Sequence, residues 1–228
     1  MRVFYDLEFL ENGKRIWLIS VALKREAGGL DSEYYAVNAA IGQGRLYERI
    51  RRHDWLMDNV IPRLPGTKVF PRGILGGGQR SFRLSLVDTR VKPLWVIANE
   101  VRDFLNPGPN GERVELWADC GAYDHVRLMQ LWGPMVNKPS FLPFWTRDIQ
   151  QYGEHLGIDP EEVDVEIPTE GSPHDALYDA RVLASQWRAL RTIEIRREGL
   201  MPSVLSTGEL VGRSFGPSEP LMPKADYA

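Results

Sequence analysis

Four carboxylates and one histidine lie in segments that are otherwise rich in apolar and aromatic residues. Asp6 and Glu8 belong to Phe4-Tyr5-Asp6-Leu7-Glu8-Phe9, Asp124 to Gly121-Ala122-Tyr123-Asp124-His125, and His174 and Asp179 to His174-Asp175-Ala176-Leu177-Tyr178-Asp179. Acids of like charge gathered in one buried place repel one another unless cations lie between them. Their convergence would predict a divalent-metal site, and phosphodiester cleavage is a familiar reaction at such a site.

The first pair of acids shares one face of a strand. Asp6 and Glu8 are two residues apart, so in an extended chain their side chains leave the same side. Two acids on a central apolar strand are costly unless they are paired or bound to metal. The alternative is an edge strand with a solvated acidic face, which Phe4 and Phe9 disfavour.

Asp124 is expected near the start of a helix, on a face shared with Leu128 and Leu131. An acid in line with an apolar stripe again indicates a site. The alternative is an ordinary acidic residue that complements the helix dipole. Asp119 is a rival acid nearby, although strand alternation places it with Glu115 and Trp117.

The late helix supplies the last acid and the histidine. Ser172-Pro173 is typical of an N-cap followed by a first-turn proline. Asp179 shares a face with Ala176 and Leu183 and is favoured as a ligand, with Asp175 as the alternative. His174 is off that face, and an unperturbed pKa of about 6.5 suits a general base.

The remaining chemical candidates are weaker. The segment Gly73–Arg80 lacks the Lys-Ser/Thr pair of a phosphate loop. Cys120 is expected to be a small buried residue. Trp117 and Trp145 are expected in the core, with stacking on bases as the alternative role.

The elements that must position these residues can be predicted from periodicity and turn signals. We expect an antiparallel meander of three strands, then alternating helices and strands, which together indicate an α/β domain on a mixed sheet. The expected strands are 2–9, 15–24, 33–37, 114–118 and 141–145. The expected helices are 45–58, 94–105, 122–133, 146–156 and 174–195, with a loop at 64–86.

Composition limits the class of protein. The 228 residues favour one domain over residues 1–195, with a loop-rich insertion near 64–90 and an irregular extension over 196–228. One cysteine permits no intrachain disulfide and favours the cytoplasm. No stretch approaches the ~20 apolar residues that cross a membrane. A net charge of −3 argues against gripping long duplexes by positive charge alone.

Taken together, the motifs resemble the DEDDh exonucleases of the RNase H-like superfamily. With Glu115-Leu116-Trp117-Ala118 and Leu131-Trp132-Gly133-Pro134-Met135 they are most similar to the polyadenylate-specific 3′-exoribonucleases called RNase AS. The resemblance implies a five-stranded mixed sheet flanked by helices. It also implies two Mg²⁺ or Mn²⁺ ions held by Asp6, Glu8, Asp124 and Asp179, and a homodimer.

From the site and the resemblance we expect a metal-dependent 3′–5′ exoribonuclease that removes nucleoside 5′-monophosphates from single-stranded RNA and favours poly(A). His174 would be the general base. Leu7, Phe9 and Tyr123, which lie beside the acids, would contact the substrate. The alternatives are a proofreading-type DNA exonuclease and a catalytically silent nucleic-acid-binding module. The carboxylates alone do not separate RNA from DNA, since sugar choice depends on contacts to the 2′-hydroxyl.

Overall fold

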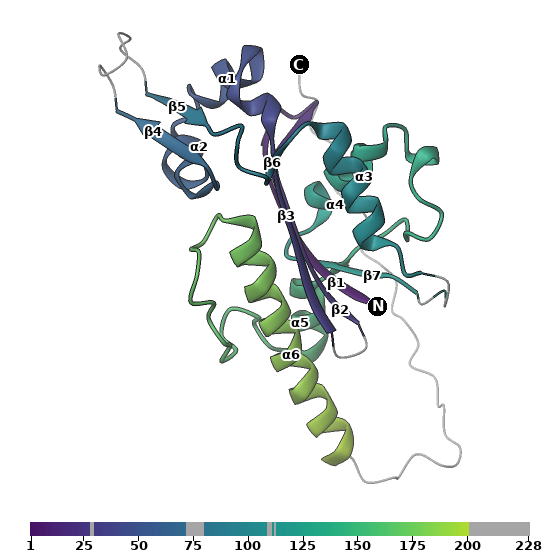
Figure 1. Cartoon of the computed structure of the whole chain (residues 1–228). Coiled ribbons are helices and arrows are strands. Elements are labelled where there is room, and N and C mark those ends of the chain that lie inside the picture. Colours follow the sequence, from purple (N-terminus) through teal and green to yellow (C-terminus); the bar gives the residue numbers. More distant parts are fainter. Residues whose placement is uncertain (28–29, 72–79, 109–110, 112, 201–228) are drawn as a thin grey trace, which may run out of the picture.

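A six-stranded mixed sheet is the frame of the molecule (Figure 1), in the order β6-β3-β2-β1-β7-β8. The computed structural model describes residues 1–27, 30–71, 80–108, 111 and 113–200. The strands of this sheet are β1 (Arg2–Glu11), β2 (Ile16–Ala27), β3 (Leu30–Asn38), β6 (Val91–Lys92), β7 (Glu115–Ala118) and β8 (Arg147–Asp148).

The first three strands form the expected meander. β1 pairs antiparallel with β2, and β2 pairs antiparallel with β3, whereas the β1–β7, β3–β6 and β7–β8 pairs are parallel. Hydrophobic side chains of β1 are buried on both faces of the sheet: Tyr5 packs into one core and Phe4 into another. The prediction that β1 is a central strand is therefore confirmed.

Helices cover both faces of the sheet. On one side lie α3 (Leu94–Leu105) and α4 (Ala122–Met129), and on the other lie α5 (Ile149–Leu156) and α6 (Ala176–Leu200), as Figure 1 shows. Ala22 of β2 and Ala176 and Ala180 of α6 form a cluster of small buried residues. Because these side chains are short, the start of α6 approaches the sheet closely at the level of the acids.

A third core lies beyond the end of β1. It is built by η1 (Ala39–Gly42), α1 (Gly44–Ile50), α2 (Asp54–Asn59), η2 (Ile61–Arg63) and a hairpin of β4 (Thr67–Phe70) and β5 (Ser81–Leu84). Its centre contains fully buried Ile41, Ile50, Met57 and Ile61. This cluster anchors α2 and η2, which flank the start of α6.

Two strand predictions were wrong. The sheet has six strands rather than five, because the two-residue strand β6 joins β3. The segment 141–145 contains Pro143, which has no amide hydrogen to donate, and it is irregular. The strand lies instead at β8, where Arg147 pairs with Trp117.

Helix bounds also differed from the predictions. The expected helix 45–58 divides into α1 and α2, because His53 caps the second helix by accepting from the Leu56 N–H at 3.3 Å. The helix that carries Asp124 ends at Met129 and continues as η3 (Gln130–Trp132), then stops at Gly133 with φ 81°. A further turn, η4 (Met135–Asn137), follows.

The predicted loop at 64–86 contains the hairpin of β4 and β5. Its residues 72–79 lie outside the described part of the chain. Helix α6 continues past the expected boundary at 195 as far as Leu200, and the rest of the predicted C-terminal extension also lies outside the described residues.

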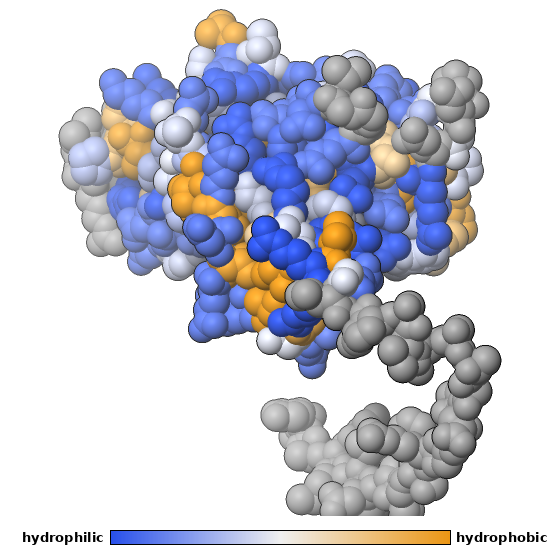
Figure 2. All heavy atoms as spheres, turned by 90° about the horizontal axis from the view of Figure 1, so that it is seen from below, coloured by the Kyte–Doolittle hydropathy of each residue, from blue (hydrophilic) through white to orange (hydrophobic). Residues whose placement is uncertain are grey.

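The surface seen from the end at which α6 finishes is mostly hydrophilic, with a hydrophobic patch near its centre and smaller hydrophobic areas toward the edges of the view (Figure 2). Of the helices that the structure describes, none is both long enough and apolar enough to span a membrane.

Candidate active site

Asp124 lies beside β1, just beyond the point at which β1 stops pairing with β7. Strand β7 pairs with β1 only at Arg2, Val3 and Phe4, so the backbone of β1 beyond that point lacks a partner strand on this side. The Leu7 N–H donates to Asp124 Oδ1 at 2.9 Å. Asp124 therefore takes the place of a strand carbonyl, and this hydrogen bond fixes its carboxylate beside β1.

The turn between β7 and α4 requires a glycine. A Cβ at Gly121 would lie 2.5 Å from Ala118 Cβ, which no ordinary contact allows. The Gly121 N–H donates to Asp148 Oδ2 at 2.9 Å, and Asp148 Oδ1 accepts from Gln150 N–H and caps α5. This tight, tethered turn places α4, and with it Asp124, at the end of the sheet.

Glu8 lies at a β-bulge. The β1–β2 register pairs Glu8 with Ser20 but Phe9 with Leu18, so Ile19 is the extra residue on β2. Bulges bend a strand locally and often re-aim side chains at functional sites. The Glu8 side chain is 9% exposed and lies on the α6 side of the sheet, as its alternation with Phe4 and Asp6 predicts.

Asp179 and His174 come together at the start of α6. His174 has φ 69°, and its backbone N–H donates to Asp179 Oδ2 at 2.9 Å. Ligand atoms of Glu8, His174 and Asp179 all lie within 4.8 Å of one another. With this spacing the three side chains could share one metal ion. Alternatively, the two acids could bind the metal while His174 accepts a proton from a water molecule beside it.

Asp175 caps the start of α6. Its Oδ1 accepts from the Leu177 N–H at 3.0 Å, so Asp175 caps the helix that begins at Ala176. The prediction of Ser172 as the N-cap, with Pro173 in the first turn, was wrong. Ser172 instead lies in the preceding turn, where its carbonyl accepts from the Asp175 N–H. Of the two acids weighed for this helix, Asp179 is the one beside Glu8.

Burial, with repulsion from nearby acids, raises the pKa of every acid in this group. Burial, then the neighbouring acids, raise the pKa of Glu8 to about 8 and that of Asp6 well above its usual range. Burial raises the pKa of Asp124 and of Asp179 to about 6, although backbone N–H donors oppose the shift. Throughout the described residues, none of the four forms an ion pair with Lys or Arg.

Two further charges act on this centre. Arg63 lowers the pKa of Glu8 and Asp179 slightly against the larger effect of burial. Burial and Arg63 together lower the pKa of His174, so its imidazole is neutral near pH 7. Asp119, the rival acid, accepts from Gln150 Nε2 at 2.9 Å, and its charge adds to the raised pKa values of Asp6, Asp124 and Asp179.

The residues expected to contact substrate differ in access. The Leu7 side chain is buried in the core, and its backbone N–H donates to Asp124, so a substrate contact at Leu7 stays a prediction. Phe9 stacks on Tyr123 with ring centroids 6.1 Å apart and planes 17° apart, and Tyr123 is 52% exposed. Phe9 and Tyr123 stay predictions for base contacts.

Of the three residues that we expected to be buried near the site, one is buried and two are exposed. Trp117 is in the core, as predicted, where it packs on Tyr152 and Trp187. Trp145 is 53% exposed and Cys120 is exposed, so the expectation that these two residues are buried was wrong. Cys120 occupies the tight turn before Gly121 with φ 48°, a position that faces outward.

Sequence reasoning missed two residues beside His174. The Trp55 ring, on α2, meets the His174 ring edge-on with centroids 4.9 Å apart. Arg63 Nε donates to Ser172 Oγ at 3.1 Å. Nothing local in the sequence marks either residue, because both contacts depend on how the third core packs against the start of α6.

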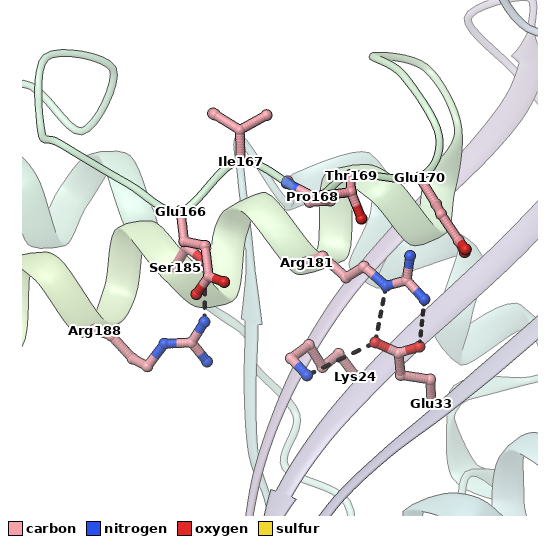
Figure 3. Close-up of a pocket in the computed structure, with 10 residues that line it drawn as sticks. All are labelled: Lys24, Glu33, Glu166, Ile167, Pro168, Thr169, Glu170, Arg181, Ser185 and Arg188. Atoms are coloured by element: carbon pink, nitrogen blue, oxygen red, sulfur yellow. Dashed lines mark hydrogen bonds and ion pairs between the residues drawn. The ribbon is translucent and has the colours of Figure 1, made fainter.

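A second group of charges lines a hollow of about 340 Å³ formed by α6, the strands β2 and β3 and the segment 166–170 (Figure 3). Here the carboxylate of Glu33 has basic partners. Arg181 donates to both Glu33 oxygens at 2.9 and 2.7 Å, Lys24 lies 3.7 Å from Glu33, and Arg188 donates to Ser185. The hydrogen bond from Arg181 lowers the pKa of Glu33.

Comparisons with known proteins give one consistent result. A family model described as the 3′-5′ exoribonuclease Rv2179c-like domain matches residues 79–191. Two curated proteins of Mycobacterium tuberculosis, 3′-5′ exoribonuclease Rv2179c of strain H37Rv and 3′-5′ exoribonuclease MT2234.1 of strain CDC 1551, are each 34% identical over 197 residues. Each alignment covers 85% of this chain and 95% of the relative.

Proposed function

Because the chain belongs to the family of Rv2179c-like 3′–5′ exoribonucleases, we propose that its acidic centre hydrolyses single-stranded RNA from the 3′ end with two divalent cations. The observation that carries the proposal is the group of Asp6, Glu8, Asp124 and Asp179. These acids are buried or partly buried, their pKa values are raised, and no basic side chain of the described chain pairs with them.

The donor set fits Mg²⁺ or Mn²⁺. Both ions prefer carboxylate oxygens, and none of the four proposed ligands is a sulfur. Asp6, Glu8, Asp124 and Asp179 would hold the ions, because divalent cations would neutralise the repulsion among these carboxylates. When bound, such ions polarise a phosphoryl oxygen and lower the pKa of a water molecule.

His174 is proposed as the general base. A ring nitrogen of His174 lies within 4.8 Å of carboxylate oxygens of Glu8 and Asp179, so a water molecule beside these acids is within its reach. Its lowered pKa leaves the imidazole free to accept a proton near pH 7. The water oxygen forms a bond to phosphorus and the bond to the 3′ oxygen breaks, releasing a nucleoside 5′-monophosphate.

The motifs support a more specific proposal for the enzyme class and the substrate. We propose a DEDDh enzyme on an RNase H-like fold, with RNA 3′ ends as substrate and a preference for poly(A). Phe9 and Tyr123 support recognition of single strands, because aromatic rings that are at least partly exposed stack on bases. The relatives' names favour RNA over the alternative of a DNA exonuclease, and a family of enzymes argues against a silent binding module.

The test is digestion of matched 5′-labelled oligomers of A, C, G and U, and of deoxyadenosine, with Mg²⁺ or Mn²⁺. We expect stepwise shortening from the 3′ end, 5′-monophosphate products and fastest loss of the adenosine oligomer. Equal digestion of all four RNA oligomers would remove the poly(A) preference. Activity that persists in EDTA would remove the metal mechanism.

A homodimer is proposed as the assembly. A hollow of about 410 Å³ beside α4 is lined by Val126, Met129, Met135 and Phe144, among others, and three of these side chains are about half exposed or more. Exposed apolar side chains gathered in one place are typical of interaction surfaces. Light scattering should give twice the chain mass, and Met135→Lys should lower it; a monomer at all concentrations would contradict the proposal.

A further inference from the structure

The neighbouring acids hold the backbone of His174 but do not fix the orientation of its imidazole ring. Its φ of 69° is uncommon for a residue with a side chain and persists only where the surroundings hold it. Its backbone N–H is tied to Asp179 Oδ2, but within the described residues its ring has no hydrogen-bond partner. Catalytic histidines are usually oriented by such a partner.

The neighbour of the imidazole ring is Trp55. The two rings meet edge-on, with centroids 4.9 Å apart and planes at 72°. Trp55 belongs to α2, whose Leu56 and Met57 are buried in the third core and whose start is capped by His53. The indole therefore stands on a fixed support, although 48% of Trp55 is exposed.

The turn before His174 is held from the same side. Arg63, in η2, donates from Nε to Ser172 Oγ at 3.1 Å and from Nη1 to Asp58 O at 3.1 Å, and Nη1 also contacts Asn59 O. The guanidinium thus joins the end of α2 to the turn that leads into α6. Because most of its donors are in use, Arg63 is better suited to hold this turn than to bind a substrate phosphate.

We propose that α2 and η2 form a bracket that orients the general base, with Trp55 and Arg63 as positioning residues for His174. Trp55 limits rotation of the imidazole, and Arg63 fixes the turn from which the imidazole projects. The inference rests on the proposed role of His174. It adds a second part of the chain, residues 54–63, to a site otherwise built from β1, α4 and α6.

The alternative for Trp55 is direct stacking on an RNA base, and kinetics separate the two roles. A positioning residue acts through His174, so its loss should lower kcat, leave KM for RNA unchanged and have no effect once His174 is gone. A stacking residue should raise KM, and its effect should multiply with that of His174→Ala.

The experiment measures kcat and KM on an adenosine oligomer for Trp55→Leu, Arg63→Met, His174→Ala and the two double variants with His174→Ala. Leu and Met preserve apolar bulk, so that folding is retained. We expect His174→Ala to lower kcat about a hundredfold or more. Trp55→Leu and Arg63→Met should each lower it about tenfold, and each double variant should equal His174→Ala. Mn²⁺ affinity, measured by calorimetry, should be unchanged.

Matched controls are Trp95→Leu, at a 70% exposed tryptophan of α3, and Arg52→Met, at an exposed arginine next to α2; both should behave as wild type. Trp55→Phe, which keeps a ring, should recover most of the turnover. Wild-type kcat in Trp55→Leu and Arg63→Met, raised KM, or multiplied effects in the double variants would overturn the bracket while leaving the nuclease intact. Failure of the proposed function would differ, since wild type itself would then release no nucleotide or His174→Ala would be fully active.

Discussion

Two groups of acids lie against helix α6, and their surroundings act on them in opposite directions. Asp179, in the first turn, lies beside Glu8, and burial raises the pKa of both. Glu33, on β3, accepts two hydrogen bonds from Arg181, which is only two residues after Asp179, and its pKa is lowered.

The difference lies in the partners rather than in the acids. In the hollow of Figure 3, Glu33 lies between Arg181 and Lys24, so the charge of this acid is compensated by bases of the same chain. In the centre formed by Asp6, Glu8, Asp124 and Asp179 the repulsion is left uncompensated. Buried charges without partners are costly to stability, and such cost is typically found where function requires it.

The largest contrast is expected in turnover. Asp6→Asn and Asp179→Asn remove a charge while preserving shape and should lower kcat on RNA by at least about a hundredfold. Glu33→Gln, the matched change in the paired group, should leave kcat within about twofold. The measurement is 5′-monophosphate release, and equal losses in Glu33→Gln and Asp6→Asn would remove the distinction between the two groups.

The pH dependence of stability should show the same contrast. For Asp124, Asp179 and Glu8 the folded pKa values of about 6, 6 and 8 lie above unfolded values near 4, so the native state binds more protons in between. Stability without divalent ions should therefore fall as pH rises from about 4 to 8, by a few kcal/mol. Denaturant unfolding in EDTA measures it. Saturating Mn²⁺ should reverse the slope; a stability that rises over this range in EDTA would contradict the electrostatics.

Asp6 and Glu33 should also differ in the sign of their contribution to folding. In EDTA at pH 8, Asp6→Asn should raise the free energy of unfolding by about 1–2 kcal/mol, because it relieves repulsion among buried acids. A loss of stability in Asp6→Asn under these conditions would mean that the carboxylate already has a partner.

The smallest effect is expected for the paired group. Glu33→Gln should lower the free energy of unfolding by less than about 1 kcal/mol, since the pair with Arg181 is partly exposed. Urea unfolding at low and high salt measures it, and the loss should shrink at high salt because screening weakens the wild-type pair. A loss of several kcal/mol would show that the hollow is more than a solvated ion pair.

The sequence was sufficient to predict most of the frame that carries the acids. Alternation along β1 placed Asp6 and Glu8 on one face, and helical spacing selected Asp179 rather than Asp175. The three-strand meander and the helix Leu94–Leu105 were also predicted correctly. These features are local, because they follow from the period of a strand or of a helix.

What the sequence could not provide depends on packing between distant segments. The bulge at Glu8, the hydrogen bond from Leu7 to Asp124 and the contacts of Trp55 and Arg63 arise only when strands and helices meet. The two-residue strand β6 is too short to show a period. Cys120 looked like a core residue by type, yet the tight turn before Gly121 leaves it exposed.

Asp6, Glu8, Asp124 and Asp179 are proposed to be held together so that they bind metal ions. Calorimetric titration of the EDTA-treated protein with Mn²⁺ at pH 8 tests this proposal most directly, with Asp6→Asn and Glu33→Gln beside wild type. We expect two ions per chain for wild type and Glu33→Gln, and loss of at least one in Asp6→Asn. Wild-type protein that binds no Mn²⁺, or Asp6→Asn that binds it as wild type does, would show that these acids are not a metal site.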